Sequence, residues 1–264
     1  MERFSAQGHA EVPEGWTQGR TAYGGLSAAY AVLAARREVA DLPALRSLQV
    51  NFTGPVTGAP EMSARLLRRG RNVASASVEG VVAKAGDATS VINALAVFGA
   101  ARDSVLDVDT PAPDGTSAPE DADAFFPPEA ARFAPRFFAN FEVRFAGGHR
   151  PVSGAPEGRM LCWARHRDPA AHGSMDPGMA EAAFVCLGDV LPPSAFPMMR
   201  APAPISSVNW TLNLLRPPDT REGWFLVETL QTAARDGYSS QRMRFWNTDG
   251  RMVADGMQAV AVFA

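Results

Sequence analysis

The sequence predicts an α+β fold of two tandem units, each with one helix and several antiparallel strands. Three observations favour it. An Ala-rich helical segment is followed by strand-like segments separated by turn residues, and a second helical segment is followed by a second such run. Short sequence matches also occur at corresponding places in the two runs, which indicates an internal duplication.

The first helix is expected within Thr21–Val39 and is expected to open at Gly24-Gly25. The first turn of a helix presents free N–H groups, and glycines let a ligand approach the backbone there. The alternative is that the two glycines only allow tight packing of the helix against its neighbours, and the sequence leaves both interpretations open.

Strands of the first unit are expected at 46–52, 60–69, 72–83 and 89–99, with turns at Gly54-Pro55, Gly70 and Gly86-Asp87 between them. A further strand is placed within His9–Thr17, before the helix. The first half is therefore interpreted as one helix followed by an antiparallel meander.

From Asp103 to about Pro135 the periodicity is lost and prolines alternate with Asp, Ala, Gly and Ser, which is typical of a linker. A compact domain seldom contains so long an irregular loop. We therefore expect an N-terminal unit at 1–103, a linker at 104–135 and a C-terminal unit at 136–264.

The second unit repeats the order of elements. Strands are predicted at 137–145 and 158–167, and a helix is predicted over Met179–Leu191, ended by Pro192-Pro193. A strand meander follows from Ser206 to Ala264, broken at Pro217-Pro218, at Asp236-Gly237 and around Gly250.

The duplication rests on two matches. N-F-T-G-P at Asn51–Pro55 corresponds to N-L-L-R-P at Asn213–Pro217, and the tripeptide A-V-F occurs at both Ala96–Phe98 and Ala261–Phe263. Two such units can pair edge to edge, which gives one continuous sheet with both helices on one side. This arrangement is the double hotdog.

Composition limits the function classes. A net charge of -3 gives no electrostatic case for nucleic acid or for an anionic membrane. Cys162 and Cys186 lack metal-ligand spacing, and Met1–Ala10 lacks a signal peptide, so we expect a cytoplasmic protein with free thiols. No phosphate-binding glycine loop and no G-x-S-x-G elbow occur, and neither a metal nor another cofactor is expected.

Three polar residues lie one to a strand in the last part of the chain: Asn209, Thr232 and Gln258. The first unit has Ser47, Leu67 and Asn93 near the corresponding positions. Because only the second copy has this trio, we interpret it as a candidate site and not as a requirement of the fold.

Several segments resemble acyl-CoA thioesterases of type II: W-T-Q-G-R-T-A-Y-G-G, L-G-D-V-L-P-P, V-N-W-T-L-N-L-L-R-P, E-T-L-Q-T-A-A and D-G-R-M-V-A-D-G-M-Q. The resemblance covers nearly the whole chain except the linker. It implies a double hotdog that hydrolyses fatty acyl-CoA. It also implies that an Asp, a Thr and a Gln hold the attacking water, at positions that fall on Asn209, Thr232 and Gln258.

Asn209 departs from that pattern, because an amide cannot act as a base at neutral pH. Asp189 is the preferred alternative carboxylate, with Asp236 behind it. Thioester hydrolysis also needs donors for the developing oxyanion. Backbone N–H groups near Tyr23, Gly24 and Gly25 are the candidates, with the Gln258 side chain as another.

The first hypothesis is thus an acyl-CoA thioesterase that releases a carboxylic acid and CoA by direct attack of water. Because of Asn209, the second is an acyl-CoA or acyl-ester binding protein without significant turnover. A hydratase of the same fold ranks third, because it would need a placed Asp/His pair that the sequence lacks. We expect a homodimer, since double hotdogs commonly pair further. The arginines of 65–71 are expected to be a solvated strand end, or else a contact for CoA phosphates.

Overall fold

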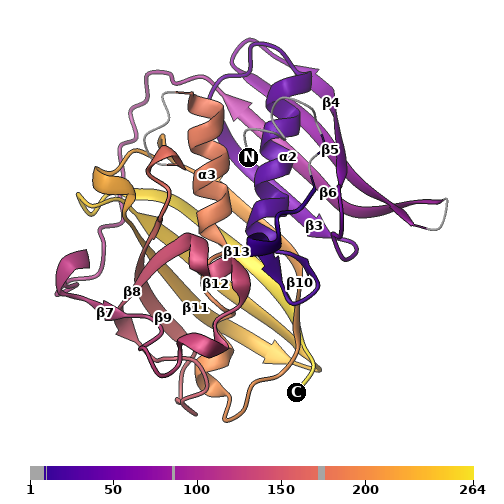
Figure 1. Ribbon diagram of the computed structural model, residues 1–264. Coiled ribbons are helices and arrows are strands. Elements are labelled where there is room, and N and C mark those ends of the chain that lie inside the picture. Colours follow the sequence, from indigo (N-terminus) through magenta and orange to yellow (C-terminus); the bar gives the residue numbers. More distant parts are fainter. Residues whose placement is uncertain (1–8, 10, 85–86, 172–175) are drawn as a thin grey trace.

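In the computed structural model, residues 9, 11–84, 87–171 and 176–264 are described. Their main feature is a single antiparallel sheet with two helices on one side of it (Figure 1). Within the described residues the sheet has 11 strands in the order β4-β5-β6-β3-β10-β13-β12-β11-β9-β8-β7. The predicted α+β double hotdog is confirmed.

The first half supplies one end of this sheet. Its elements are α2 (Gly24–Glu38), β3 (Leu45–Phe52), β4 (Glu61–Arg69), β5 (Val73–Lys84) and β6 (Asp87–Gly99). The helix begins at the predicted glycine pair. The strand preceding it differs from expectation: a 3-10 turn at Glu14–Trp16 leads into the two-residue strands β1 (Thr17–Gln18) and β2 (Thr21–Ala22), which pair only with each other.

The second half supplies the rest. Its elements are β7 (Asp123–Ala124), β8 (Phe141–Gly148), β9 (Arg159–His166), α3 (Pro177–Gly188), β10 (Ile205–Leu214), β11 (Phe225–Arg235), β12 (Tyr238–Trp246) and β13 (Met252–Val262). α3 begins two residues before the predicted start, because the Asp176 side chain accepts the Met179 N–H as an N-cap and Pro177 suits the first helical position.

The halves join where β3 pairs with β10, from Asn51 opposite Asn209 to Ser47 opposite Asn213. The Ser47 hydroxyl also donates to the Asn213 side chain across this junction. The joining strands are the two that carry the matched N-x-x-x-P segments. The edge-to-edge pairing predicted from the duplication is therefore observed.

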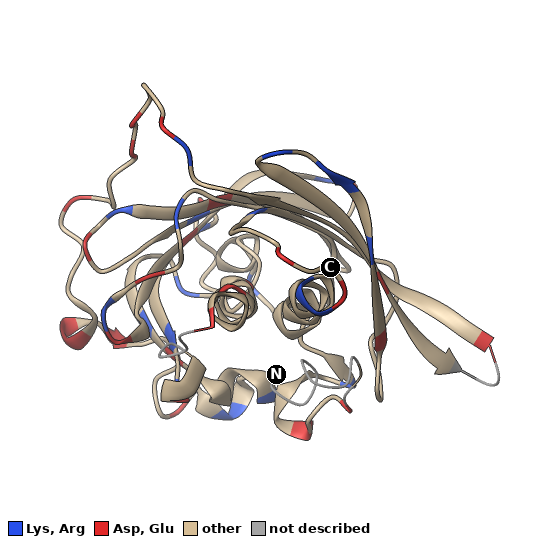
Figure 2. Ribbon diagram, turned by 90° about the horizontal axis from the view of Figure 1, so that it is seen from above, with Lys and Arg blue, Asp and Glu red and all other residues tan. Residues whose placement is uncertain are grey.

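Both helices are enclosed by the sheet, which curves around them (Figure 2). They run antiparallel, since Gly25 lies against Cys186 at one end while Arg36 lies against Gly178 at the other. The helical residues of α2 from Gly25 to Ala35 are buried, and their small Ala side chains permit close approach of α3 and the sheet. The N-terminus of each helix thus lies beside the C-terminus of the other.

The segment predicted as a linker packs on the outer face of the second half of the sheet. On β9, Met160 and Cys162 face the main core, whereas Leu161 and Trp163 belong to a separate cluster on the opposite face. The Trp163 indole N–H donates to the Ser117 carbonyl at 2.8 Å, and the Trp246 indole N–H donates to that of Thr110 at 2.8 Å. Residues 109–124 therefore form a strap that covers the apolar residues of this outer face.

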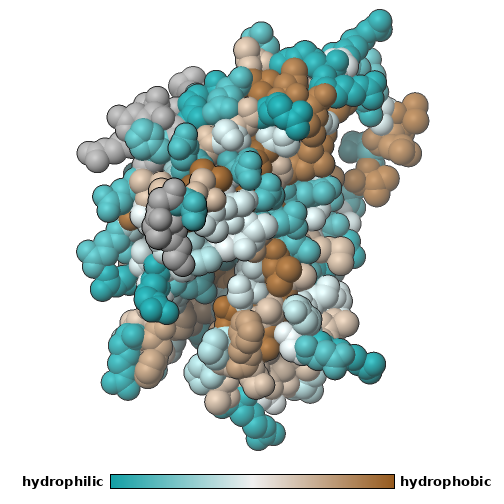
Figure 3. Space-filling model, turned by 90° about the vertical axis from the view of Figure 1, so that its right-hand side faces the viewer, coloured by the Kyte–Doolittle hydropathy of each residue, from teal (hydrophilic) through white to brown (hydrophobic). Residues whose placement is uncertain are grey.

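β4 is an edge strand with exposed arginines, among them Arg65, Arg68 and Arg69. Figure 3 shows the side of the molecule on which this end of the sheet lies, and hydrophobic residues occur there only in separate patches. Charged side chains on an edge strand oppose pairing with another chain. Among the described residues, no helix has the length and apolar character needed to cross a membrane.

Candidate active site

A carboxylate lies where the end of α3 meets the start of α2. Asp189 is the C-cap of α3 and is partly exposed. Its carboxylate receives hydrogen bonds from the backbone N–H of Gly25 and from Gln258 Nε2, the latter at 2.8 Å. The two halves of the chain thus meet at this group, since Gly25 belongs to the first and Asp189 and Gln258 to the second.

The glycine pair is required by contact, not by backbone conformation. A Cβ on Gly24 would lie 2.6 Å from Asp189 Oδ2, and a Cβ on Gly25 would lie 2.3 Å from the Cys186 carbonyl oxygen. Both interpretations of this pair therefore have a physical basis. Gly25 allows the two helices to pack closely, and Gly24 leaves room for the carboxylate at the helix start.

Burial raises the pKa of Asp189 to about 7, against an ordinary value of 3.8. The hydrogen bonds from Gln258 and Gly25 act in the opposite direction but are outweighed. The positive end of the α2 dipole also favours the anion, although the carboxylate ends α3, where the dipole disfavours it. The carboxyl can thus accept and release a proton near neutral pH.

Gln258 extends from Asp189 into a buried line of amides. Its Oε1 accepts from Gln241 Nε2 at 2.7 Å, and Gln241 Oε1 accepts from the Ser194 backbone N–H at 2.6 Å. A second contact joins Gln258 Nε2 to Ser207 Oγ at 3.3 Å. Gln258, predicted from the sequence as a site residue, is therefore in direct contact with the predicted alternative carboxylate.

Tyr23 lies beside this site, but its donors are used internally. Its hydroxyl donates to the Cys186 carbonyl at 2.8 Å, and its backbone N–H donates to the Trp16 carbonyl at 2.9 Å. The ring stacks on Phe137 with centroids 4.0 Å apart. Tyr23 therefore fixes the start of α2 against α3 and leaves Gly24 as the candidate backbone donor for a ligand.

The structure does not bring the predicted trio together. Asn209 and Thr232 are both exposed, whereas Gln258 is 4 % exposed. The Thr232 hydroxyl donates to the Ser240 carbonyl at 2.9 Å. Each of the two lies at a β-bulge, between Ser207 and Asn209 in β10 and between Gln231 and Ala233 in β11. A bulge adds a residue to one strand and so changes which side chains face the core.

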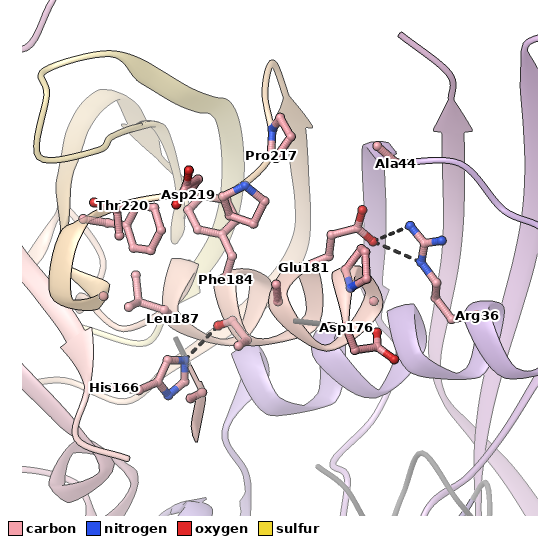
Figure 4. Close-up of a pocket in the computed structure, with 18 of the residues that line it drawn as sticks. Arg36, Ala44, His166, Asp176, Glu181, Phe184, Leu187, Pro217, Asp219 and Thr220 are labelled. Carbon is pink, nitrogen blue, oxygen red and sulfur yellow. Dashed lines mark hydrogen bonds and ion pairs between the residues drawn. The ribbon is translucent and has the colours of Figure 1, made fainter. Parts of the chain in front are cut away.

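The opposite end of the helix pair has different chemistry. Arg36 and Asp189 occupy equivalent positions, since each lies equally far in sequence from the first residue of its helix, Gly24 or Pro177. Arg36 donates twice to Glu181 and also to the carbonyls of Leu42 and Pro43. Figure 4 shows this ion pair between the two helices. One end of the helix pair thus has a carboxylate held by an amide and a backbone N–H, and the other has a closed ion pair.

A cavity of about 720 Å³ adjoins that ion pair. Its walls come from α3 and from the loop after β10, and side chains of Phe184, Leu187 and Pro217 point toward it in Figure 4. His166 also lines it, and its Nε2 lies 2.8 Å from the Ala183 carbonyl oxygen. Arg36, Glu181 and His166 are engaged with the protein itself, and Asp176 caps α3. Asp219 also lines this cavity, but it is exposed and lies in the loop after β10, away from a helix start.

Other candidates are weaker. Asp236 is exposed in the tight turn between β11 and β12, at a φ of 53°. In the part of the chain that the structure describes, no group of three His, Cys, Asp or Glu side chains could hold a metal ion. Cys162 and Cys186 are free and buried, and burial raises both thiol pKa values above their ordinary range.

Sequence reasoning missed the amide line behind Gln258. A signal was present, because Ser239, Gln241, Met243 and Phe245 alternate along β12 and share its inner face. A glutamine at an inward position next to Met243 is unusual, since a buried amide needs partners for its donors and acceptors. Ser194 could not be located in this way, because it lies in an irregular segment after α3.

Two family descriptions match the chain. Residues 113–262 match the acyl-CoA thioesterase C-terminal domain, and residues 12–99 match the acyl-CoA thioesterase N-terminal domain. No curated protein matches the chain.

Solved structures share the fold over nearly the whole length. A conserved hot dog protein of unknown function from Alicyclobacillus acidocaldarius has a TM-score of 0.82 and 25% identity, covering 97% of this chain and 92% of that one. A putative thioesterase II from Thermobifida fusca has a TM-score of 0.75 and 18% identity, with the same coverage. The acyl-CoA thioesterase II TesB2 from Mycobacterium marinum has a TM-score of 0.69 and 20% identity, covering 90% and 88%.

Proposed function

Because this chain belongs to the acyl-CoA thioesterase family, we propose that it hydrolyses the thioester of an acyl-CoA at Asp189. The observation that carries the proposal is the position of this carboxylate. It lies at the start of α2 in hydrogen-bond contact with Gln258 and Gly25, and its pKa is raised to about 7. A base with a pKa near the working pH is best suited to proton transfer.

In the proposed reaction, a water oxygen forms a bond to the thioester carbonyl carbon while Asp189 takes a proton from that water. The tetrahedral intermediate then collapses, the C–S bond breaks, and the sulfur leaves as the CoA thiolate. The proton held by Asp189 is available to the thiolate, so the products are a carboxylic acid and free CoA. These reaction steps form no covalent intermediate with the protein.

Gln258 is the proposed orienting group. One Nε2 hydrogen points at Asp189, which holds the carboxylate in place for the water. The other lies toward Ser207 at 3.3 Å, a longer contact that a bound water or substrate oxygen can replace. Burial of the amide limits competing water, and electrostatic interactions in such a site are stronger than in solvent.

The start of α2 is the proposed oxyanion site. Gly24 supplies the first N–H of the helix and is partly exposed, whereas the Gly25 N–H is engaged by Asp189. Charge that develops on the thioester oxygen would be stabilised there by the N–H group and by the helix dipole. The absence of a side chain on Gly24 leaves room for the Asp189 carboxylate, so the proposed base lies next to the proposed N–H donor.

The test compares two positions. Asp189→Asn should lower kcat/KM for acyl-CoA hydrolysis by about 100-fold or more, because it removes the proposed base while keeping the side-chain shape. Asn209→Ala serves as the matched control on the exposed position that the resemblance implies. We expect near wild-type rates from it, measured by thiol release across acyl chain lengths.

If Asn209→Ala is inactive and Asp189→Asn is active, the trio of Asn209, Thr232 and Gln258 would be the catalytic site and Asp189 would not be the base. No turnover with any chain length, together with measurable acyl-CoA binding, would favour a binding protein of the same fold. We also propose that the chain acts as a homodimer in the cytoplasm, which size-exclusion chromatography with light scattering and cell fractionation would test.

A further inference from the structure

We propose that Gln241 is a positioning residue that sets the orientation of the Gln258 amide, so that Nε2 and not Oε1 faces Asp189. The inference rests on the function proposed above, because it assigns Gln241 a part in the same site. The side-chain hydrogen bonds of Gln241 go to Ser194 and Gln258, and Gln258 in turn contacts Asp189. Gln241 therefore acts on the carboxylate through Gln258.

The geometry is a chain of donors with one direction. The Ser194 backbone N–H donates to Gln241 Oε1 at 2.6 Å. Gln241 Nε2 then donates to Gln258 Oε1 at 2.7 Å, and Gln258 Nε2 donates to Asp189 Oδ1 at 2.8 Å. The distances of 2.7 and 2.8 Å lie in the ordinary range for N–H···O hydrogen bonds, and that of 2.6 Å is slightly shorter.

The direction follows from the first member. The two ends of an amide differ little in shape, so either orientation fits the same space and hydrogen bonding decides between them. A backbone N–H can only donate, so Gln241 must turn its oxygen to Ser194 and its NH₂ to Gln258. Gln258 must then turn its own oxygen to Gln241, which leaves its NH₂ for the carboxylate.

Burial fixes the orientation of both amides. Gln241 is 0 % exposed and Gln258 is 4 % exposed, so neither amide can exchange a lost partner for bulk solvent. A flipped amide would place two oxygens or two NH₂ groups against each other, at the cost of an unsatisfied buried group. The fixed backbone N–H of Ser194 therefore determines which end of the Gln258 amide faces Asp189.

The orientation matters because an NH₂ facing Asp189 favours its ionised form, whereas a carbonyl oxygen would favour its protonated form. Few other groups could account for a change in its titration. Among the described residues, the titratable groups that interact with its charge are Tyr23, before α2, and Cys186 of α3, and burial raises the pKa of both. From β13 it faces the uncharged Gln258, which also contacts the hydroxyl of Ser207 on β10.

Two substitutions test the idea in different ways. Gln241→Glu keeps the size of the side chain but, when ionised, can only accept hydrogen bonds, so it draws Gln258 Nε2 to itself and turns Gln258 Oε1 toward Asp189. Gln241→Leu removes the link and leaves Gln258 free to adopt either orientation. We expect the Asp189 pKa to rise by about one unit or more in Gln241→Glu, where the new carboxylate also repels Asp189 when ionised. In Gln241→Leu the rise should be smaller, and there it reports the orientation of Gln258 alone because no charge is added.

Gln231→Leu is the matched control. Gln231 lies opposite Gln241 in the pairing of β11 with β12, and its side-chain oxygen accepts from the hydroxyls of Ser194, at 2.9 Å, and Ser239. Gln231 therefore lies beside the same segment but takes part in none of the three hydrogen bonds that connect the Ser194 backbone N–H to Asp189. Its replacement should leave the Asp189 pKa unchanged. Thermal melting of all variants shows which of them remain folded.

The readout is a ¹³C carboxyl NMR titration of Asp-labelled protein, with the Asp189 signal assigned by its loss in Asp189→Asn. The pH profile of kcat/KM for acyl-CoA hydrolysis is the second readout, and its acid limb should move up with the pKa. A merely structural role for Gln241 would lower the rate at every pH without moving that limb.

The two readouts separate the two proposals. An Asp189 signal that titrates as in the wild type in both Gln241 variants overturns the orienting role, whatever the activity. A shifted titration in a protein that hydrolyses no acyl-CoA supports the orienting role and refutes the proposed function.

Discussion

Replacing Asp189 by Asn should stabilise the protein relative to the wild type as the pH rises above neutral, while it lowers activity by about 100-fold or more. The pKa of this carboxyl is about 7 in the folded chain, against an ordinary value of 3.8. The folded state therefore binds the proton more tightly than the unfolded state does. The contribution of this carboxyl to the free energy of unfolding is fully present below the pKa of the unfolded state. It is lost as the pH rises from that value through the pKa of the folded state.

The magnitude follows from the two pKa values. A rise from 3.8 to about 7 corresponds to about 4 kcal/mol of unfavourable free energy once the group is ionised in both states. Between about pH 5 and about pH 8 the change is roughly 2.5 kcal/mol, and residual exposure of the carboxylate reduces it to about 2 kcal/mol. The Asp189→Asn variant has no such dependence at this position, since an amide does not titrate in this range.

The assay is urea unfolding of both proteins at the two pH values. The useful quantity is the change in the stability difference between them, because any pH-independent cost of fitting Asn into the site cancels. We expect the variant to gain about 2 kcal/mol relative to the wild type on going from the acid to the alkaline condition. An equal pH dependence in the two proteins would show that Asp189 does not titrate in this range, and the case for it as the base would fall.

Three further outcomes are expected. Gly24→Ala should lower kcat/KM by about 100-fold. Its Cβ would lie 2.6 Å from Asp189 Oδ2, and relieving this contact displaces the carboxylate by nearly an ångström. Wild-type kinetics in a folded variant would contradict this contact. Asn209→Asp should change the rate by less than about threefold at an exposed position, and a large gain in thiol release would instead support the strand trio. Glu181→Gln should lower the free energy of unfolding by about 3 kcal/mol, because it removes the buried charge that pairs with Arg36; unchanged urea unfolding would refute this.

Local sequence patterns were sufficient to predict most of the fold. The Gly24-Gly25 pair marked the start of α2, and the matched segments at Asn51 and Asn213 identified the strands that join the halves. These features depend on backbone conformation and on alternation along single strands, which neighbouring residues largely determine. The segment at 109–124 was predicted only as a connection, because its packing depends on tryptophans far away in sequence.

The site could be predicted only in part. Asp189, Gln258 and Gly24 were named from the sequence and lie together. Asn209 and Thr232 were assigned to the same site because the trio lies one to a strand in the second copy and because of the resemblance, neither of which accounts for breaks in the alternation of a strand. The bulges beside Asn209 and Thr232 interrupt that alternation. A bulge depends on pairing with the neighbouring strands, so a single strand's sequence does not reveal it.

The strap over the outer sheet face provides an optical reporter. Trp163 and Trp246, two of the chain's five tryptophans, lie beneath it with their indole N–H groups bonded to its carbonyls. Indoles that become exposed to water emit at longer wavelength. Detachment of residues 109–124 should therefore shift the fluorescence to the red while the far-ultraviolet circular dichroism of α2, α3 and the sheet stays constant. Emission spectra in low urea would thus follow this segment separately from global unfolding.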